Sequence, residues 1–209
     1  MGTDAGTFSG DFRTIKHNHL FLVDDQHGFI PKDNLAGLGF YYLDTRFLSA
    51  FELLINNQRP VTLLSSTESG YLSTLVYTNR QIDTETPDHR SITIPKETLL
   101  IRRETVLNEA MFEKIKLINY NDSPIKITLT FFVEADFRDI FEVRNFVAQP
   151  DPHAVQVDWA PPQLAFTYKD ATGETLKSLF TFADFEPELL AQSHRGAEFM
   201  LRLTLLPHE

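Results

Sequence analysis

Apolar and polar side chains alternate along much of this 209-residue chain. In residues 125–133 every odd position is apolar, and most of the even positions between them are Lys or Thr. Successive side chains of a strand point to opposite faces, so a period of two is typical of a strand with one buried face. Residues 164–168 and 199–205 repeat the pattern, and long segments with the helical spacing of an α/β fold are missing. The pattern predicts an all-β protein.

Turn-forming residues separate the alternating segments. Asp170–Gly173 lies between the apolar runs 164–168 and 176–182, which predicts a hairpin. Asn121–Pro124 and Asn56-Asn57 predict two further reversals of the chain. About a dozen such segments follow one another at the spacing that is usual in a sandwich.

The resulting fold class is an antiparallel β-sandwich (a super-sandwich) of about a dozen strands with little helix. One short helical turn is expected at Phe185–Ala191, where Pro187 is tolerated only near the start. Residues 1–20 are expected to form an N-terminal segment with the first strand, and residues 21–209 a single sandwich domain.

Composition narrows the class of function. The hydrophobic fraction of 42% and the 18 Phe residues indicate a real core. The net charge of −10, without a cluster of Lys and Arg, argues against nucleic-acid binding. The lack of cysteine excludes disulfides, thiolate catalysis and cysteine-based zinc sites. The opening residues show no signal peptide, and no apolar run approaches the ~20 residues of a membrane span, so a cytoplasmic protein with no membrane partner is expected.

Two segments, Gly39–Ser49 and Glu134–Arg144, place carboxylates and arginines among large apolar residues. Charges in such surroundings are usually paired or used in a function. They form either an ion-pair network that fixes a bend in the sandwich or a surface for a ligand or a partner domain. The candidate residues of these segments are Asp44, Thr45, Arg46, Asp136, Asp139, Glu142 and Arg144.

Carboxylates of the second segment could also serve in catalysis. Glycoside hydrolysis needs two carboxylates, and Glu134, Asp136, Asp139 and Glu142 lie within nine residues. Arginines in the same segment would keep them ionised, whereas a general acid needs a raised pKa, so the ion-pair network is favoured. His17 and His19 are expected on a polar strand face, and neither a metal nor a cofactor is expected.

Aromatic residues offer a second kind of site. Tyr41, Tyr42 and Trp159 are candidates for stacking against a sugar ring, although aromatic residues of strands are more often part of the core. Further exposed-tyrosine candidates are Tyr71, Tyr77 and Tyr168.

The two charged segments also carry a family resemblance. Gly37–Ser49, followed by Glu52–Asn56 and Leu63–Ser66, resembles the N-terminal domain of glycogen debranching enzyme-like (amylo-α-1,6-glucosidase) proteins. Ala135–Arg144 is similar to the D-F-x-D-[IL]-F-E-V-R signature of the same family. The resemblance extends from about Phe21 to the end of the chain.

This resemblance implies an antiparallel sandwich that precedes an (α/α)-barrel catalytic domain, which holds the glycosidase carboxylates. The chain contains no such barrel, so it is expected to be a non-catalytic accessory domain, without catalytic residues of its own, in a glycoside hydrolase. It would pack on the catalytic barrel of the same polypeptide, shape its substrate cleft, and expose an apolar docking face through which the isolated domain could form a homodimer. The alternatives are an α-glucan-binding module and a self-sufficient hydrolase that uses the carboxylates of 134–142.

Overall fold

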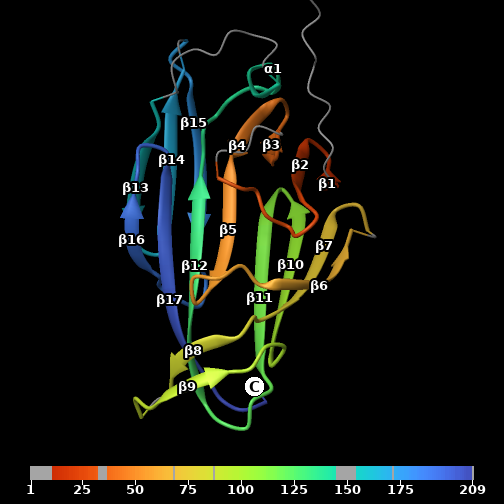
Figure 1. The fold of residues 1–209 in the computed structure, drawn as a ribbon. Coiled ribbons are helices and arrows are strands. Elements are labelled where there is room, and N and C mark those ends of the chain that lie inside the picture. Colours follow the sequence, from red (N-terminus) through yellow and green to blue (C-terminus); the bar gives the residue numbers. More distant parts are fainter. Residues whose placement is uncertain are drawn as a thin grey trace, which may run out of the picture.

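The computed structural model describes residues 11–32, 37–67, 69–86, 88–144, 154–170 and 172–208. Within these residues, seventeen strands pair in antiparallel sheets, and a single short helix is present (Figure 1). The predicted all-β antiparallel class is confirmed. The strands outnumber the predicted dozen because several are only four residues long, too short to show a clear alternation.

Two four-stranded sheets provide most of the sandwich. The central sheet has the strand order β16 (Glu188–Gln192), β17 (Gly196–Leu205), β12 (Ile125–Glu134), β5 (Ala50–Ile55). The second sheet has the order β11 (Ala110–Asn119), β10 (Leu99–Asn108), β7 (Leu72–Thr78), β6 (Val61–Ser66).

Three smaller groups complete the fold. The N-terminal sheet contains β1 (Phe12–His17), β2 (Leu20–Asp25), β3 (Gly39–Tyr42) and β4 (Thr45–Leu48) in sequence order. A three-stranded sheet contains β13 (Gln156–Ala160), β14 (Gln163–Lys169) and β15 (Thr175–Thr181). A separate hairpin is formed by β8 (Ile82–Glu85) and β9 (Ser91–Ile94), and the helix α1 spans Ile140–Val143.

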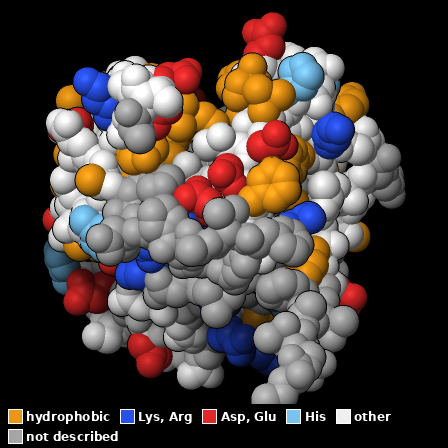
Figure 2. Space-filling model, turned by 90° about the horizontal axis from the view of Figure 1, so that it is seen from above, with side chains coloured by type: hydrophobic (Ala, Val, Ile, Leu, Met, Phe, Trp, Pro, Cys, Tyr) orange, Lys and Arg blue, Asp and Glu red, His pale blue; other side chains and the backbone are white. Residues whose placement is uncertain are grey.

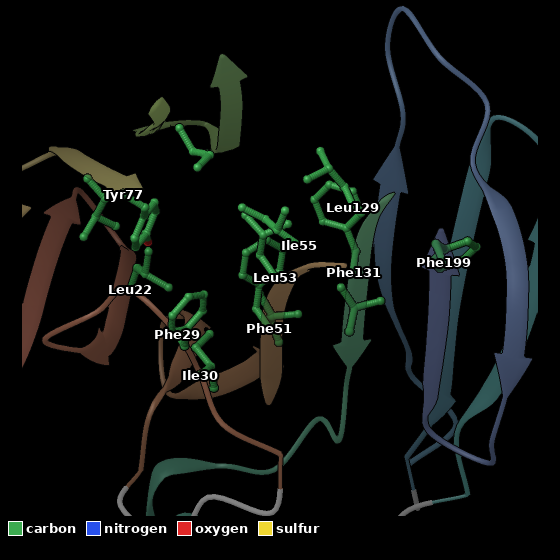
Figure 3. Packing of buried hydrophobic residues seen from close by; sticks show 14 of the residues in the cluster. Leu22, Phe29, Ile30, Phe51, Leu53, Ile55, Tyr77, Leu129, Phe131 and Phe199 are labelled. Carbon is green, nitrogen blue, oxygen red and sulfur yellow. The ribbon is translucent and has the colours of Figure 1, made fainter. Parts of the chain in front are cut away.

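One cluster of buried side chains connects the four larger sheets. Its members include Ile15 of β1, Ile101 of β10, Phe131 of β12 and Phe166 of β14. Each such side chain contributes about 1.5–3 kcal/mol when it is fully buried. Figure 3 shows the β5 side chains Phe51, Leu53 and Ile55 in the middle of this cluster. On one side of them lie Leu129 and Phe131 of β12, and on the other lie Leu22 of β2 and Phe29 and Ile30 of the segment that follows β2.

The turn predictions had mixed outcomes. The hairpin around Asp170–Gly173 is confirmed, since β14 pairs with β15 and the Asp170 carboxylate accepts the amides of Thr172 and Glu174. The chain does reverse at Asn121–Pro124, but β11 and β12 belong to different sheets instead of forming a hairpin.

The helical turn expected at Phe185–Ala191 was wrong. Residues 188–192 form β16 instead, with Glu188 opposite Met200 and Leu189 opposite Phe199 of β17. Leu189 packs against the buried cluster, so tertiary pairing outweighs local helix propensity. In the part of the chain that the structure describes, no helix has the length and apolar character that crossing a membrane requires.

Candidate functional site

The two charged segments lie side by side at one end of the sandwich. The amide of Arg46 donates to the carbonyl of Arg138 at 2.8 Å, and the amide of Ile140 donates to the carbonyl of Asp44 at 2.8 Å. The amide of Ser49 donates to the carbonyl of Glu134 at 2.7 Å. The segments are therefore two antiparallel neighbours, although about 90 residues separate them in sequence.

A buried ion pair connects the segments. Nε and Nη2 of Arg46 donate to the two carboxylate oxygens of Asp136 at 3.0 and 2.5 Å, and Nη1 donates to the carbonyl of Leu38 at 3.1 Å. Both residues are only 5% exposed. Burial alone would lower the pKa of Arg46, but the hydrogen bonds and charge of Asp136 outweigh it and raise that pKa above its usual value. The pair therefore connects the two segments inside the fold.

Gly39 makes room for this arginine. A Cβ atom added at Gly39 would lie 2.5 Å from Cδ of Arg46 and 2.7 Å from the backbone oxygen of Leu48. The backbone oxygen cannot move aside without shifting β4, so the site accepts only glycine.

We expect Gly39→Ala to lower the free energy of unfolding by about 1–3 kcal/mol, the usual effect of overpacking. Urea denaturation measures the change. Gly70→Ala is the control, since a Cβ there meets no atom within 4 Å and only its positive φ of 71° opposes the change. A loss at Gly39 no larger than that at Gly70 would contradict the steric explanation.

Asp139 and Glu142 hold the helix α1. Asp139 Oδ1 accepts the amides of Phe141 and Glu142, at 2.7 and 2.9 Å, and Oε2 of Glu142 accepts the amide of Asp139 at 2.9 Å. This reciprocal arrangement is a capping box, which satisfies amides that a helix start leaves open. Sequence analysis had proposed a bend here and missed the helix.

Two more charged residues of the second segment lie near charges of opposite sign. Glu134 is buried and forms an ion pair with Arg195 at 3.7 Å, and Arg138 lies 3.9 Å from Asp136. Each of the four carboxylates considered for hydrolysis thus contacts a cation or helix amides. These contacts favour the structural interpretation of the carboxylates over a catalytic pair.

The same segments leave three large apolar side chains exposed. Tyr42 is 47% exposed, Leu43 51% and Phe141 56%. Because the amide of Ile140 bonds to Asp44, α1 lies directly beside the turn between β3 and β4. We call these three residues, with the exposed Asp44, the apolar end surface. Seen from above, this end carries hydrophobic and acidic side chains next to one another (Figure 2).

Comparison with protein families matches residues 15–209 to a family described as the N-terminal domain of some glycogen debranching enzymes. The chain belongs to this family. Membership confirms the resemblance, and both charged segments lie within the matched residues of this debranching-enzyme domain. No curated protein matches the chain.

The aromatic residues proposed to stack against a sugar ring differ in burial. Tyr41 is buried, its ring stacks on Phe21 with 4.7 Å between centroids, and its hydroxyl donates to the carbonyl of Gly37. Burial raises the pKa of Tyr41, and neither ring face is open to a sugar. Trp159 is partly buried against Phe199, at 4.8 Å between centroids.

The other tyrosines also differ in burial. Tyr77 is buried, Tyr168 is stacked against Phe137, and Tyr71 is 48% exposed. His17 ends β1, but His19 lies in the β1–β2 turn, so the prediction that both histidines share a strand face was wrong. Across the described residues, no three side chains of His, Cys, Asp or Glu are grouped closely enough to hold a metal ion.

A second buried charge cluster in this debranching-enzyme domain was missed by sequence analysis. Nε and Nη2 of Arg103 each donate to a carboxylate oxygen of Glu113 at 2.8 Å, which connects β10 to β11. Nη1 donates to the carbonyl of Gly28 at 2.5 Å, and the guanidinium lies 4.4 Å from the ring centre of Phe51. One signal was available: Arg103 occupies a buried position in an alternating strand whose other buried members are Leu99, Ile101, Thr105 and Leu107.

Asp24 belongs to the neighbourhood of this cluster. Arg13 donates to its two carboxylate oxygens at 3.0 and 2.6 Å, and Asp24 itself is 2% exposed. Burial raises the pKa of Asp24 to about 6, against the opposing effect of Arg13 and Arg103.

This raised pKa gives a pH dependence of stability. Between about pH 4 and 6 the folded protein keeps a proton on Asp24 that an unfolded aspartate, with its pKa of about 3.9, has released. The contribution of Asp24 to the free energy of unfolding is therefore present below about pH 4 and is lost as the pH rises through 6. Urea denaturation should show a larger advantage of the wild type over Asp24→Asn at pH 4.5 than at pH 7. An advantage that grows with pH would contradict the raised pKa.

Proposed function

We propose that this chain is a non-catalytic accessory domain of an α-glucan debranching glycosidase, and that it packs on the catalytic barrel of the same polypeptide. One observation carries the proposal: the two segments that characterise the family bury Glu134 and the Arg46–Asp136 pair and leave Tyr42, Leu43 and Phe141 exposed. The apolar end surface is the proposed docking face, and from there the domain would shape the rim of the substrate cleft. We propose the cytoplasm as its compartment, because the chain has no cysteine.

Docking fits the chemistry of this face. Aromatic and large aliphatic side chains are enriched at the centre of protein interfaces, where their burial supplies most of the affinity. The helix α1 would be a marginal element in isolation, yet a capping box fixes it and so fixes the direction of Phe141. The face is therefore pre-organised, which lowers the entropy loss on binding.

The position of β17 sets a condition on the connection. This strand runs from Gly196, opposite Glu134 near α1, to Leu205 at the other end of the central sheet (Figure 1). At ~3.3 Å per residue, a barrel that follows the domain needs a connection of roughly ten extended residues to return to the apolar end surface.

The direct test mixes the separately produced chain with the helical catalytic region of a longer family member and measures binding by calorimetry. We expect the wild type to bind and the double variant Leu43→Glu/Phe141→Glu to lose binding, because two charges would enter the centre of an apolar contact. Phe112→Glu is the matched control: Phe112 is 58% exposed, like Phe141, but lies on β11 of the second sheet.

Loss of binding in the Phe112→Glu control, or unchanged binding in the double variant, would contradict the proposed face. Sedimentation of the chain alone tests the related homodimer. If the same surface mediates self-association, the double variant is monomeric at concentrations at which the wild type is dimeric.

A further inference from the structure

A groove with a mixed polar and apolar lining lies at the end of the central sheet away from α1. It has a volume of about 820 Å³, is open to solvent, and is lined by residues of the β8–β9 hairpin and of β12 and β17. Figure 1 shows this hairpin at the end of the sheet opposite α1. Ile92, Ile127 and Leu203 contribute the apolar part of its lining. The polar part consists of Asn56, Asp83, Thr84, Glu85, Ser91, Thr93, Lys126, Thr128, Arg202 and Thr204.

Paired residues of β12 and β17 form the floor of this groove. Lys126 is paired with Thr204, and Thr128 with Arg202, so these four side chains share the outer face of the sheet. The hairpin forms the wall and is fastened to β12, since the Thr84 hydroxyl donates to the carbonyl of Lys126 at 2.6 Å.

The lining is rich in groups that both donate and accept hydrogen bonds. Five of its side chains are hydroxyls, and Lys126 and Arg202 balance Asp83 and Glu85 in charge. Arg202 is paired with Glu188, whereas within the described residues the Lys126 amine forms no ion pair. Such a lining matches a neutral ligand that carries many hydroxyl groups.

Other classes of ligand fit less well. A peptide strand would need an open backbone edge, but near the groove the Asn56 and Thr84 side chains already bond to the edge of β12, Asn56 accepting the amide of Thr128 at 2.9 Å. The net charge of −10 opposes nucleic acid. A purely apolar ligand would cover the Lys126 amine without giving it a partner.

We propose that this groove binds a neutral oligosaccharide chain through hydrogen bonds to its hydroxyl groups. Because no aromatic ring lines the groove, binding to one short chain is weak, and a branched polymer with many chain ends is retained more strongly. The choice of an α-glucan as the probe rests on the proposed function.

Affinity electrophoresis in gels that contain glycogen tests the site on the chain itself. We expect the wild type to be retarded, and Lys126→Ala/Arg202→Ala to bind about tenfold more weakly, since charge-assisted hydrogen bonds are lost. Lys116→Ala is the control, because this lysine also faces outward in the middle of a strand but lies on β11. Equal unfolding midpoints in urea would show that the variants are folded.

The site would be overturned by no retardation of the wild type in glycogen, or by unchanged retardation of the double variant. Retardation that is lost in Tyr42→Ala and kept in the groove variants would also overturn it, by moving the contact to the other end. Failure of this proposal can be distinguished from failure of the docking proposal. Docking is measured by calorimetry with the catalytic region and with variants of Leu43 and Phe141, not by retardation in glycogen.

Discussion

Replacing Arg46 with alanine is expected to lower the free energy of unfolding by about 3–5 kcal/mol, because the Asp136 carboxylate would remain buried without its partner. Urea denaturation followed by circular dichroism measures this loss. The same experiment on Arg46→Met/Asp136→Leu should recover much of it, since apolar residues of similar volume avoid burying a lone charge.

Arg144→Ala is the control for this prediction. Arg144 lies in the same charged segment, and removing it would cost roughly 3–5 kcal/mol only if it had a buried partner. Its side chain is exposed in the structure, so we now expect a loss below about 1 kcal/mol. Equal losses for Arg46→Ala and Arg144→Ala would show that the buried pair does not determine the stability of this end.

Arg103→Ala is expected to have a comparable effect, about 3–5 kcal/mol. The substitution removes both hydrogen bonds to Glu113, the bond to Gly28 and the contact with Phe51. Arg103→Lys should also destabilise the fold, because a single ammonium cannot bond to both carboxylate oxygens and to the carbonyl in this planar arrangement.

The adjacent arginine provides the control for this second prediction. Arg102 lies on the outer face of β10, where its side chain is 54% exposed and pairs with Glu104. Because exposed pairs contribute little, we expect Arg102→Ala to lower the free energy of unfolding by less than about 1 kcal/mol. A loss for Arg103→Ala as small as that for Arg102→Ala would contradict the role of the buried cluster.

Alternation of side chains predicted the strands well where a strand is long. The segment 125–133 became β12 with its odd positions buried, because a ten-residue strand under a core must place apolar groups on one face. Strands as short as β3 and β4 contain too few residues for the alternation to be recognised. Which strands pair within one sheet depends on residues that are far apart in sequence. The reversal at Asn121–Pro124 shows the limit: its turn residues fix a change of direction but not the sheet that the chain joins.

The charged segments could be recognised from sequence, but their partners could not. That Arg46 pairs with Asp136, and not with Asp44 two residues away, follows only from the alignment of two backbones 90 residues apart. Likewise, the family signature at Ala135–Arg144 contains a helix start, since Asp139 and Glu142 stand at the spacing of a capping box. That spacing is a usable signal for a helix start, which the ion-pair interpretation of the segment leaves out.

The central claim is that the charged segments form an internal scaffold that presents the apolar end surface to a catalytic domain. Hydrogen exchange, read by mass spectrometry, tests it most directly by comparing this chain alone with the longer polypeptide of a debranching enzyme that contains it. The account predicts slower exchange in the longer polypeptide for the amides of residues 41–44 and 140–143, with the central strands unchanged. Unchanged exchange at these amides, together with slower exchange for the amides of β10 and β11, would contradict it.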